Sequence, residues 1–240
     1  MKRRPQLIYE DEHVLVVSKP PFLLTVPDRY APEKANLFHM MQERYGRVFV
    51  VHRLDKETSG ILVMARNEEA HRHLSLQFEH REVEKAYLTI VEGRLHYEEG
   101  LIDKPLMPID SKPVRVVVSA KGKPAQTRYK VVEYLGNFTL VRAWILTGRM
   151  HQVRVHFQAL GYPLVVDPLY GRRDAFYLSE IKRNYHLAKG EEERPLLARS
   201  ALHAEQLTFT HPATQERMTF EAPLPRDMAA VVKQLRKWAR

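Results

Sequence analysis

Cysteine is absent from this chain of 240 residues. Its absence excludes disulfide bonds, thiolate zinc sites, cysteine-ligated iron–sulfur clusters and cysteine nucleophiles. No apolar run approaches the ~20 residues that a transmembrane helix requires. The basic N-terminus is followed by Pro5 instead of the apolar core of a signal peptide. We therefore expect a cytoplasmic protein with no membrane partner.

Positive charge is in excess: the chain has 38 Lys and Arg against 29 Asp and Glu, a formal net charge of +9. Hydrophobic residues make up 44% and charged residues 28%, which is typical of a folded, soluble chain. A cationic surface favours a polyanionic partner such as nucleic acid, although charge also serves solubility alone. The length allows one large domain or two small ones.

The expected strands and helices predict an α+β fold. Leu7–Val17 is rich in Val and Ile and predicts one strand that stops before Pro20. Further strands are expected over 48–51, 61–65, 86–92, 114–119, 127–134, 139–146, 201–209 and 218–221. Because strands and helices are mixed without regular βαβ alternation, we expect a central, mostly antiparallel mixed sheet with flanking helices.

Four helices are expected among these strands. Asn36 is placed to cap a helix over 37–45, and Asn67 to cap another. The third carries Met150, Val153, Phe157 and Leu160 on one buried face, and the fourth, within 226–240, is basic and carries a stripe of Met228, Val231, Val232, Leu235 and Trp238. The highly charged residues 172–199 predict a surface insertion.

Two polar clusters could carry chemistry. In the loop over 52–60, Asp55 lies between two cations that favour its ionised form, although an Asp here could simply cap the following turn. In the segment over 147–156, helical spacing places His151 and Arg154 on one face with Gln158. A solvated basic face is the alternative for this second cluster.

These clusters resemble the motifs of a known family. His52-Arg53-Leu54-Asp55-Lys56-Glu57-Thr58-Ser59-Gly60 resembles the HRLDxxTSG signature of the RluA family of pseudouridine synthases. Four further stretches resemble the family in order: Lys85-Ala86-Tyr87, residues 147–156 (TGRxHQIRxH), residues 161–171 (GHPIxGDPxYG) and Leu202-His203-Ala204. The chain departs from these patterns at Met150, Tyr162 and Val166. The resemblance extends from about Leu7 to Pro223.

The resemblance implies a pseudouridine synthase catalytic domain over 7–225, with an RNA-binding cleft across its sheet. A C-terminal basic amphipathic helix over 226–240 would follow, and no S4 RNA-binding domain is expected. The implied activity is isomerisation of specific uridines to pseudouridine in structured RNA, namely a stem-loop of 23S ribosomal RNA, of tRNA, or of both. No cofactor and no metal are expected, and we expect a monomer.

The family's chemistry, carried over residue by residue, assigns the catalytic carboxylate to Asp55. Arg154 would be its salt-bridge partner, with a bidentate geometry that Lys would not reproduce. Tyr87 would support the site with its aromatic face against the uracil; a half-buried strand tyrosine is the alternative.

Four residues are expected to contact RNA or the base. Arg53 would fill the space that a flipped nucleotide leaves, or bind phosphate. Arg149 and His151 would help to hold the RNA backbone or the loop. Leu202 would pack on the other face of the base, and the C-terminal helix would add an RNA contact.

Two other classes of function stay open at this point. One is a non-catalytic RNA-binding or ribosome-assembly protein on the same fold. The other is a carboxylate hydrolase, such as a glycosidase with Asp55 and Glu57. Two carboxylates two positions apart on a loop do not define a separation across a sugar, and the positive charge fits RNA better.

Overall fold

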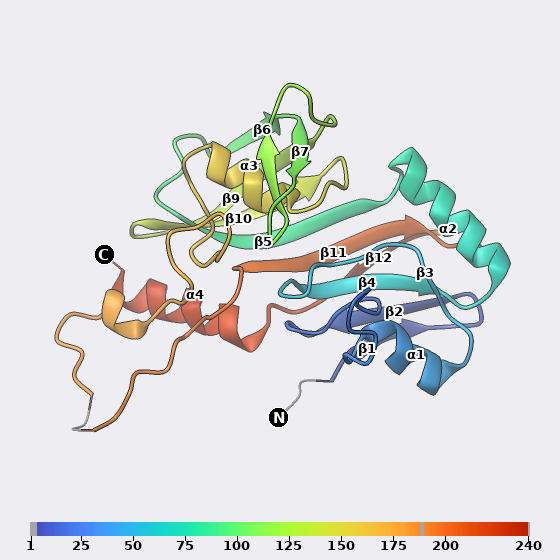
Figure 1. Ribbon diagram of the computed structural model, residues 1–240, viewed down its shortest axis with the longest axis horizontal. Coiled ribbons are helices and arrows are strands. Elements are labelled where there is room, and N and C mark those ends of the chain that lie inside the picture. The colour runs from blue at the N-terminus through green and yellow to red at the C-terminus, as the bar shows by residue number, and fades with distance from the viewer. Residues whose placement is uncertain (1–3, 188–189, 240) are drawn as a thin grey trace. The chain divides into compact units, whose positions relative to one another are not determined.

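The computed structural model describes residues 4–187 and 190–239, which form two compact units (Figure 1). The first unit takes in the chain up to Ala86 together with His203–Pro223, and the second takes in Tyr87–Leu202 and the chain from Leu224 onward. The segment expected as one catalytic domain over 7–225 thus includes parts of both units, and the C-terminal helix groups with the second. Among the described residues, no helix is long and apolar enough to cross a bilayer.

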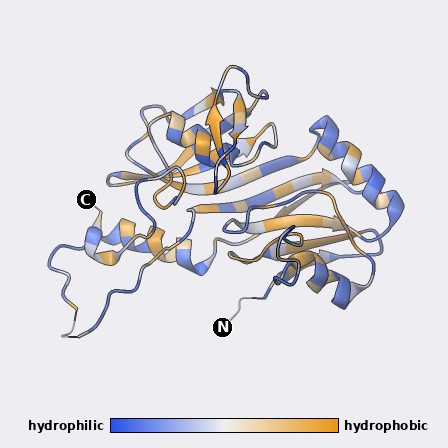
Figure 2. Ribbon diagram, viewed as in Figure 1, coloured by the Kyte–Doolittle hydropathy of each residue, from blue (hydrophilic) through white to orange (hydrophobic). Residues whose placement is uncertain are grey.

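The sheet of the first unit has β4 as a central strand. The strand order is β1 (Gln6–Glu10), β2 (Val14–Lys19), β4 (Ser59–Ala65) and β11 (Leu202–Thr210), with β3 (Phe49–Val50) beside β4 and β12 (Arg217–Glu221) beside β11. β2 runs antiparallel to β4, whereas β11 runs parallel to it. All residues of β4 are buried, and most of the strand is hydrophobic (Figure 2). This burial makes β4 a rigid base for the loop that precedes it.

The expected single strand over Leu7–Val17 is wrong, because the chain folds back as the antiparallel hairpin of β1 and β2. Asp11 makes the turn: its Oδ1 accepts the backbone N–H groups of His13 and Val14, both at 2.7 Å. An Asp side chain that binds nearby backbone amides favours a turn over a continuous strand. The Val- and Ile-rich composition of the segment hid this local signal.

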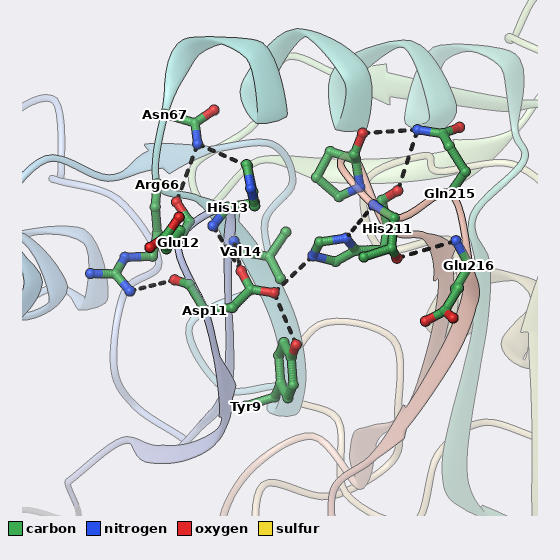
Figure 3. Close-up of polar contacts among 12 residues, drawn as sticks. Tyr9, Asp11, Glu12, His13, Val14, Arg66, Asn67, His211, Gln215 and Glu216 are labelled. Carbon is green, nitrogen blue, oxygen red and sulfur yellow. Dashed lines mark hydrogen bonds and ion pairs between the residues drawn. The ribbon is translucent and has the colours of Figure 1, made fainter.

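The second oxygen of Asp11 joins the hairpin to the end of β11 (Figure 3). Its Oδ2 accepts the Tyr9 hydroxyl at 2.9 Å and His211 Nε2 at 2.8 Å. His211 Nδ1 accepts the Thr214 amide at 3.1 Å, so its proton resides on Nε2 and is donated to Asp11. Burial alone would raise the pKa of Asp11. The amides of Val14 and His13, the Tyr9 hydroxyl and His211 outweigh burial and lower that pKa.

Two helices of the first unit begin where the sequence predicted. Helix α1 (Leu37–Tyr45) is capped by Asn36, whose Oδ1 accepts the His39 amide at 2.9 Å, and it ends at Gly46. Helix α2 (Glu68–His80) is capped in the same way by Asn67. Both starts are confirmed, because an N-cap depends on contacts within one helical turn.

The sheet of the second unit is mostly as expected. Its strand order is β5 (Glu84–Glu92), β10 (Phe138–Ile145), β9 (Gln126–Leu135) and β6 (Glu99–Asp103), and β7 (Leu106–Ile109) pairs with β8 (Arg115–Val118) in a separate ribbon. The sequence did not predict β6 or β7. Both are short, and β7 contains Pro108, which weakens a strand signal.

Helix α3 (Gln152–Ala159) differs from the expected helix in its start and its faces. His151 has φ 55° and precedes the helix, and Met150 is 38% exposed instead of lying on a buried face. Residues Gln152 to Phe157 are all buried. The alternative of a solvated basic face is therefore wrong for Arg154, and only Gln158 of that face is exposed.

Helix α4 and the charged segment over 172–199 both contain buried residues. Helix α4 (Arg226–Trp238) follows β12 and buries its expected stripe except for Trp238, which is only partly buried. A 3-10 turn, η1 (Leu178–Glu180), lies earlier in the chain, within the charged segment over 172–199. Within 172–199, Phe176, Leu197 and Arg199 are buried, so the expected surface insertion is wrong for these positions. Residues 188–189 of that segment and Arg240 of the expected helix lie outside the described residues.

Candidate active site

The loop that carries Asp55 is held at the residues on either side of it. Thr25 Oγ1 donates to the Leu54 carbonyl at 2.9 Å and accepts the Leu54 amide at 3.2 Å. The Lys56 carbonyl accepts the Phe22 amide at 2.8 Å and the fully buried Lys19 ammonium at 3.2 Å. Hydrogen bonds to the backbone of Leu54 and Lys56 therefore fix the backbone position of the half-buried Asp55 between them.

The end of this loop is joined to β11. Ser59 Oγ lies 3.0 Å from His203 Nδ1, and His203 Nε2 lies 3.0 Å from the Ala222 carbonyl. A carbonyl only accepts, so a neutral His203 carries its proton on Nε2 and accepts the Ser59 hydroxyl proton at Nδ1. Gly60 has φ 122°, and a Cβ there would lie 2.1 Å from the Ala204 carbonyl oxygen, so only glycine fits.

His52 fixes the start of the loop and is neutral. Its Nε2 accepts the Val63 amide at 3.1 Å, and its ring stacks on Phe78 with the centroids 4.5 Å apart. Desolvation and the nearby Lys85 ammonium lower the pKa of His52 to about 3. His52 therefore holds backbone and does not exchange protons near neutral pH.

The segment over 147–156 is held by a polar network that sequence reasoning missed. Gln152 Oε1 accepts the Thr147 hydroxyl at 2.7 Å and the Arg149 amide at 3.0 Å, while its Nε2 donates to Thr127 Oγ1 at 3.0 Å. Thr127 in turn bonds the buried His156 at 2.9 Å. These motif residues hold the turn before α3 against β9, and Arg154 is the charged side chain that α3 buries.

Arg154 forms a buried, two-bond ion pair with Asp167. Nε lies 2.7 Å from Oδ2 and Nη2 lies 2.7 Å from Oδ1, with the two residues 5% and 1% exposed. The sequence predicted Asp55 as the partner of Arg154 and assigned no role to Asp167. An available signal was the stretch over 167–171, in which Asp precedes Pro and Gly follows closely, a composition typical of an Asp-capped turn.

That turn holds Asp167 in place and presents Tyr170 beside it. Oδ1 of Asp167 accepts the amides of Leu169 at 3.0 Å and Tyr170 at 3.1 Å. A Cβ at Gly171 would lie 2.7 Å from the Asp167 carbonyl oxygen. The guanidinium carbon of Arg154 lies over the face of the Tyr170 ring, 5.0 Å from its centre, so the guanidinium contacts both Asp167 and Tyr170.

The other candidate residues lie at different depths. Tyr87 on β5 and Leu202 at the start of β11 are buried, and Arg53 is exposed. Arg149 is half-buried, and its Nε donates to the Pro124 carbonyl at 3.1 Å. His151 Nδ1 lies 2.7 Å from the Tyr170 hydroxyl, which brings His151 beside Arg154 in the second unit.

The described residues contain no group of three or more His, Cys, Asp or Glu side chains placed to hold a metal ion.

Comparison with known proteins identifies the class to which this protein belongs. The model of the RNA pseudouridylate synthase family matches residues 13–159, and the chain belongs to this family. It is thus an enzyme, an isomerase of uridine in RNA, and the resemblance to the RluA family is confirmed.

Two curated relatives show how far the similarity extends. The chain is 42% identical over 219 residues to the dual-specificity RNA pseudouridine synthase RluA of Escherichia coli K12, which covers 90% of this chain and 92% of that protein. It is 37% identical over 238 residues to the ribosomal large subunit pseudouridine synthase D of Nitrosomonas europaea, covering 96% of this chain and 65% of that protein.

Two solved structures confirm the expected α+β fold. Human RNA pseudouridylate synthase domain containing 4 matches with a TM-score of 0.72 at 23% identity, over 96% of this chain and 93% of that one. Human RNA pseudouridylate synthase domain containing 1 matches with a TM-score of 0.69 at 27% identity, over 97% and 95%.

Proposed function

We propose that this enzyme isomerises a uridine in a stem-loop of ribosomal RNA, of tRNA, or of both, with Asp55 as its catalytic carboxylate. The observation that carries the proposal is the fixed loop: Leu54, Lys56 and Ser59 are each bonded to another segment of the first unit, and Asp55 lies between them. The dual specificity named for the Escherichia coli relative supports both kinds of RNA, and the Nitrosomonas europaea relative supports ribosomal RNA.

The reaction breaks the N1–C1′ bond of uridine, turns the base and joins C5 to C1′. N1 gains a proton and C5 loses one, so the composition of the nucleotide does not change. Asp55 acts as a nucleophile or assists departure of the base, and both roles need its ionised form. The reaction therefore consumes no redox equivalent and no nucleoside triphosphate.

Arg154 supplies the positive charge for Asp55 in this proposal. Arginine suits the role because its planar group has donors on two edges and can bind two carboxylates. Asp167 engages Nε and Nη2, so the edge that includes Nη1 is the one assigned to Asp55. Tyr87 stacks on the uracil and Leu202 packs on its other face.

The basic residues supply RNA affinity and base flipping. Arg53 fills the space left by the flipped nucleotide, and Arg149 and His151 hold the backbone or the loop. Cationic surfaces on α4 and on the β7–β8 ribbon add phosphate contacts. We propose that the active enzyme is a monomer in the cytoplasm.

The proposal is tested with an isolated stem-loop of ~15–20 nucleotides that contains one target uridine. Asp55→Asn keeps the shape of the side chain and removes its charge, so we expect no pseudouridine while the Kd for RNA stays within about threefold, because phosphate contacts dominate affinity. Pseudouridine mapping and filter binding provide the two readouts.

The matched control places the same uridine in a continuous duplex, where unstacking costs a few kcal/mol more and the reaction should be far slower. Normal turnover by Asp55→Asn would remove Asp55 from the mechanism. Tight RNA binding by the wild type without pseudouridine on any RNA would favour a non-catalytic RNA-binding protein instead.

A further inference from the structure

The buried guanidinium of Arg154 is held on two sides by residues that are themselves fixed. Asp167 binds it in its plane through Nε and Nη2. The guanidinium lies over the Tyr170 ring, and the Tyr170 hydroxyl accepts the Val116 amide at 2.8 Å and bonds His151. Asp167 and Tyr170, which we call the clamp, come from one turn. The Gly171 amide closes this turn by donating to the Asp167 carbonyl at 2.8 Å.

This arrangement restricts rotation of the guanidinium. An arginine side chain has several rotatable bonds, and an ion pair through one edge still allows the far edge to tilt. The Tyr170 ring beneath the guanidinium opposes that tilt, because a movement off the ring loses the cation–π contact. The plane of the group, and hence the direction of its Nη1 edge, is therefore set by Asp167 and Tyr170 together.

Stability alone is a weak explanation for the clamp. Burying two charges costs desolvation energy, and well-packed apolar residues of similar volume often give equal or greater stability. The side-on geometry with Asp167 uses the Nε/Nη2 edge, and the adjacent Nη1/Nη2 edge has two parallel N–H groups that match a second carboxylate. The clamp thus fixes the direction in which the Nη1/Nη2 edge of Arg154 points.

We infer that Asp167 and Tyr170 are positioning residues for the reaction: they hold the guanidinium of Arg154 in the plane in which its Nη1/Nη2 edge binds the reacting carboxylate. The inference rests on the proposed function, in which that carboxylate is Asp55. It predicts that loosening the clamp lowers kcat and leaves RNA affinity unchanged, because Asp167 and Tyr170 do not touch RNA in this assignment.

The decisive comparison is between Tyr170→Phe and Tyr170→Leu. Both variants lose the hydroxyl and its bonds to Val116 and His151, but only the leucine variant loses the ring beneath Arg154. We expect the leucine variant to be about tenfold slower in kcat than the phenylalanine variant, the size of a partly desolvated cation–π contact. Kd for the stem-loop should be equal in the two variants.

Asp167→Asn removes the in-plane partner and should lower kcat by about a hundredfold, since truncating one member of a buried charge pair has large effects. Arg154→Lys is the control for the proposed function and should also be slow. Melting temperatures of all variants are measured alongside, and the Tyr170 pair decides the outcome if Asp167→Asn fails to fold.

Equal kcat for the two Tyr170 variants would overturn the inference, as would a folded Asp167→Asn enzyme with normal kcat. A loss of kcat matched by equal losses in melting temperature and RNA affinity would reduce the clamp to a structural role and also overturn it. A normal rate for Arg154→Lys would instead contradict the proposed pairing of Arg154 with Asp55, which is a separate failure.

Discussion

At the scale of single residues, three histidines bind backbone, hydroxyl or carboxylate groups of neighbouring segments. His52 accepts a backbone amide, neutral His203 accepts the Ser59 hydroxyl, and His211 accepts an amide while donating to Asp11. Each is assigned one tautomer by a partner that can only donate or only accept. Some polar residues of the motifs thus hold the backbone in place, whereas Asp55 and Arg154 are the candidates for catalysis.

The lowered pKa of His52 predicts a pH dependence of stability. The unfolded chain takes up a proton near pH 6.5, whereas folded His52 resists protonation down to about pH 3. Its contribution to the free energy of unfolding is therefore complete above pH 6.5 and is lost as the pH falls toward 3. The slope approaches ~1.4 kcal/mol per pH unit.

His52→Gln is the matched variant, because an amide oxygen can accept the Val63 amide but does not titrate. Urea unfolding at a series of pH values should show a shallower slope in this variant between pH 6.5 and 3. Parallel curves for the two proteins would show that His52 protonates equally in the folded and unfolded chains.

At the scale of elements, helix α4 is attached at its first turn by an ion pair between the buried Arg199 and the partly buried Asp227. Arg199 is 1% exposed, and its Nε and Nη2 lie 2.9 and 3.0 Å from the two carboxylate oxygens of Asp227. Nη1 of Arg199 also donates to the Leu202 carbonyl at 3.2 Å. The helix has no side-chain N-cap, and Asp227 provides the negative charge that favours a helix start.

Asp227→Asn should therefore destabilise the protein, because it leaves the buried Arg199 cation unpaired. Removing one partner of a buried pair costs about 3–5 kcal/mol. Adding Arg199→Met in the same chain should restore much of the loss, since no buried charge then remains. Denaturant midpoints of the single and double variants check this, and an unchanged midpoint for Asp227→Asn would mean that solvent already screens Arg199.

At the scale of the whole molecule, the positive charge is unevenly distributed along the chain. Residues 104–130, which include β7 and β8, contain seven Lys and Arg against one Asp, so they contribute +6 of the net +9. Most of these cations are exposed. On α4, the sequence's candidate for RNA contact, Arg236 is bonded to Glu133 at 2.7 Å. Of these seven cations, Arg128 and Lys130 lie on β9, and the other five lie on β8 or in the loops beside the β7–β8 ribbon. The ribbon and its loops are therefore a second candidate for phosphate contact beside α4.

Lys121→Ala combined with Lys123→Ala should weaken RNA binding and lower the slope of log Kd against log salt by about one to two, since each phosphate contact contributes about 0.7–0.9. Lys233→Ala with Lys237→Ala measures α4 in the same way. Lys34→Ala is the control, because Lys34 is paired with Asp28 at 3.4 Å and should leave the slope unchanged. An unchanged slope for the ribbon variant would exclude the ribbon from the RNA interface.

Local features of this protein were determined by the sequence itself. The starts of α1 and α2 follow from Asn36 and Asn67, because a cap is a bond to an amide three residues away. The loop around Asp55 could be recognised because its residues are contiguous. Most strands were predictable for the same reason, while β6 and β7 were missed because their apolar signal is short.

Partners far apart in the chain were decided only by the tertiary structure. Asp11 meets His211 across 200 residues, and this contact anchors the β1–β2 hairpin to the end of β11. Arg199, expected on a surface, is buried against Asp227, and Arg154 binds Asp167, which no spacing rule singled out. A buried charge must find its partner among all segments that pack together, and that choice depends on the whole fold instead of on neighbouring residues.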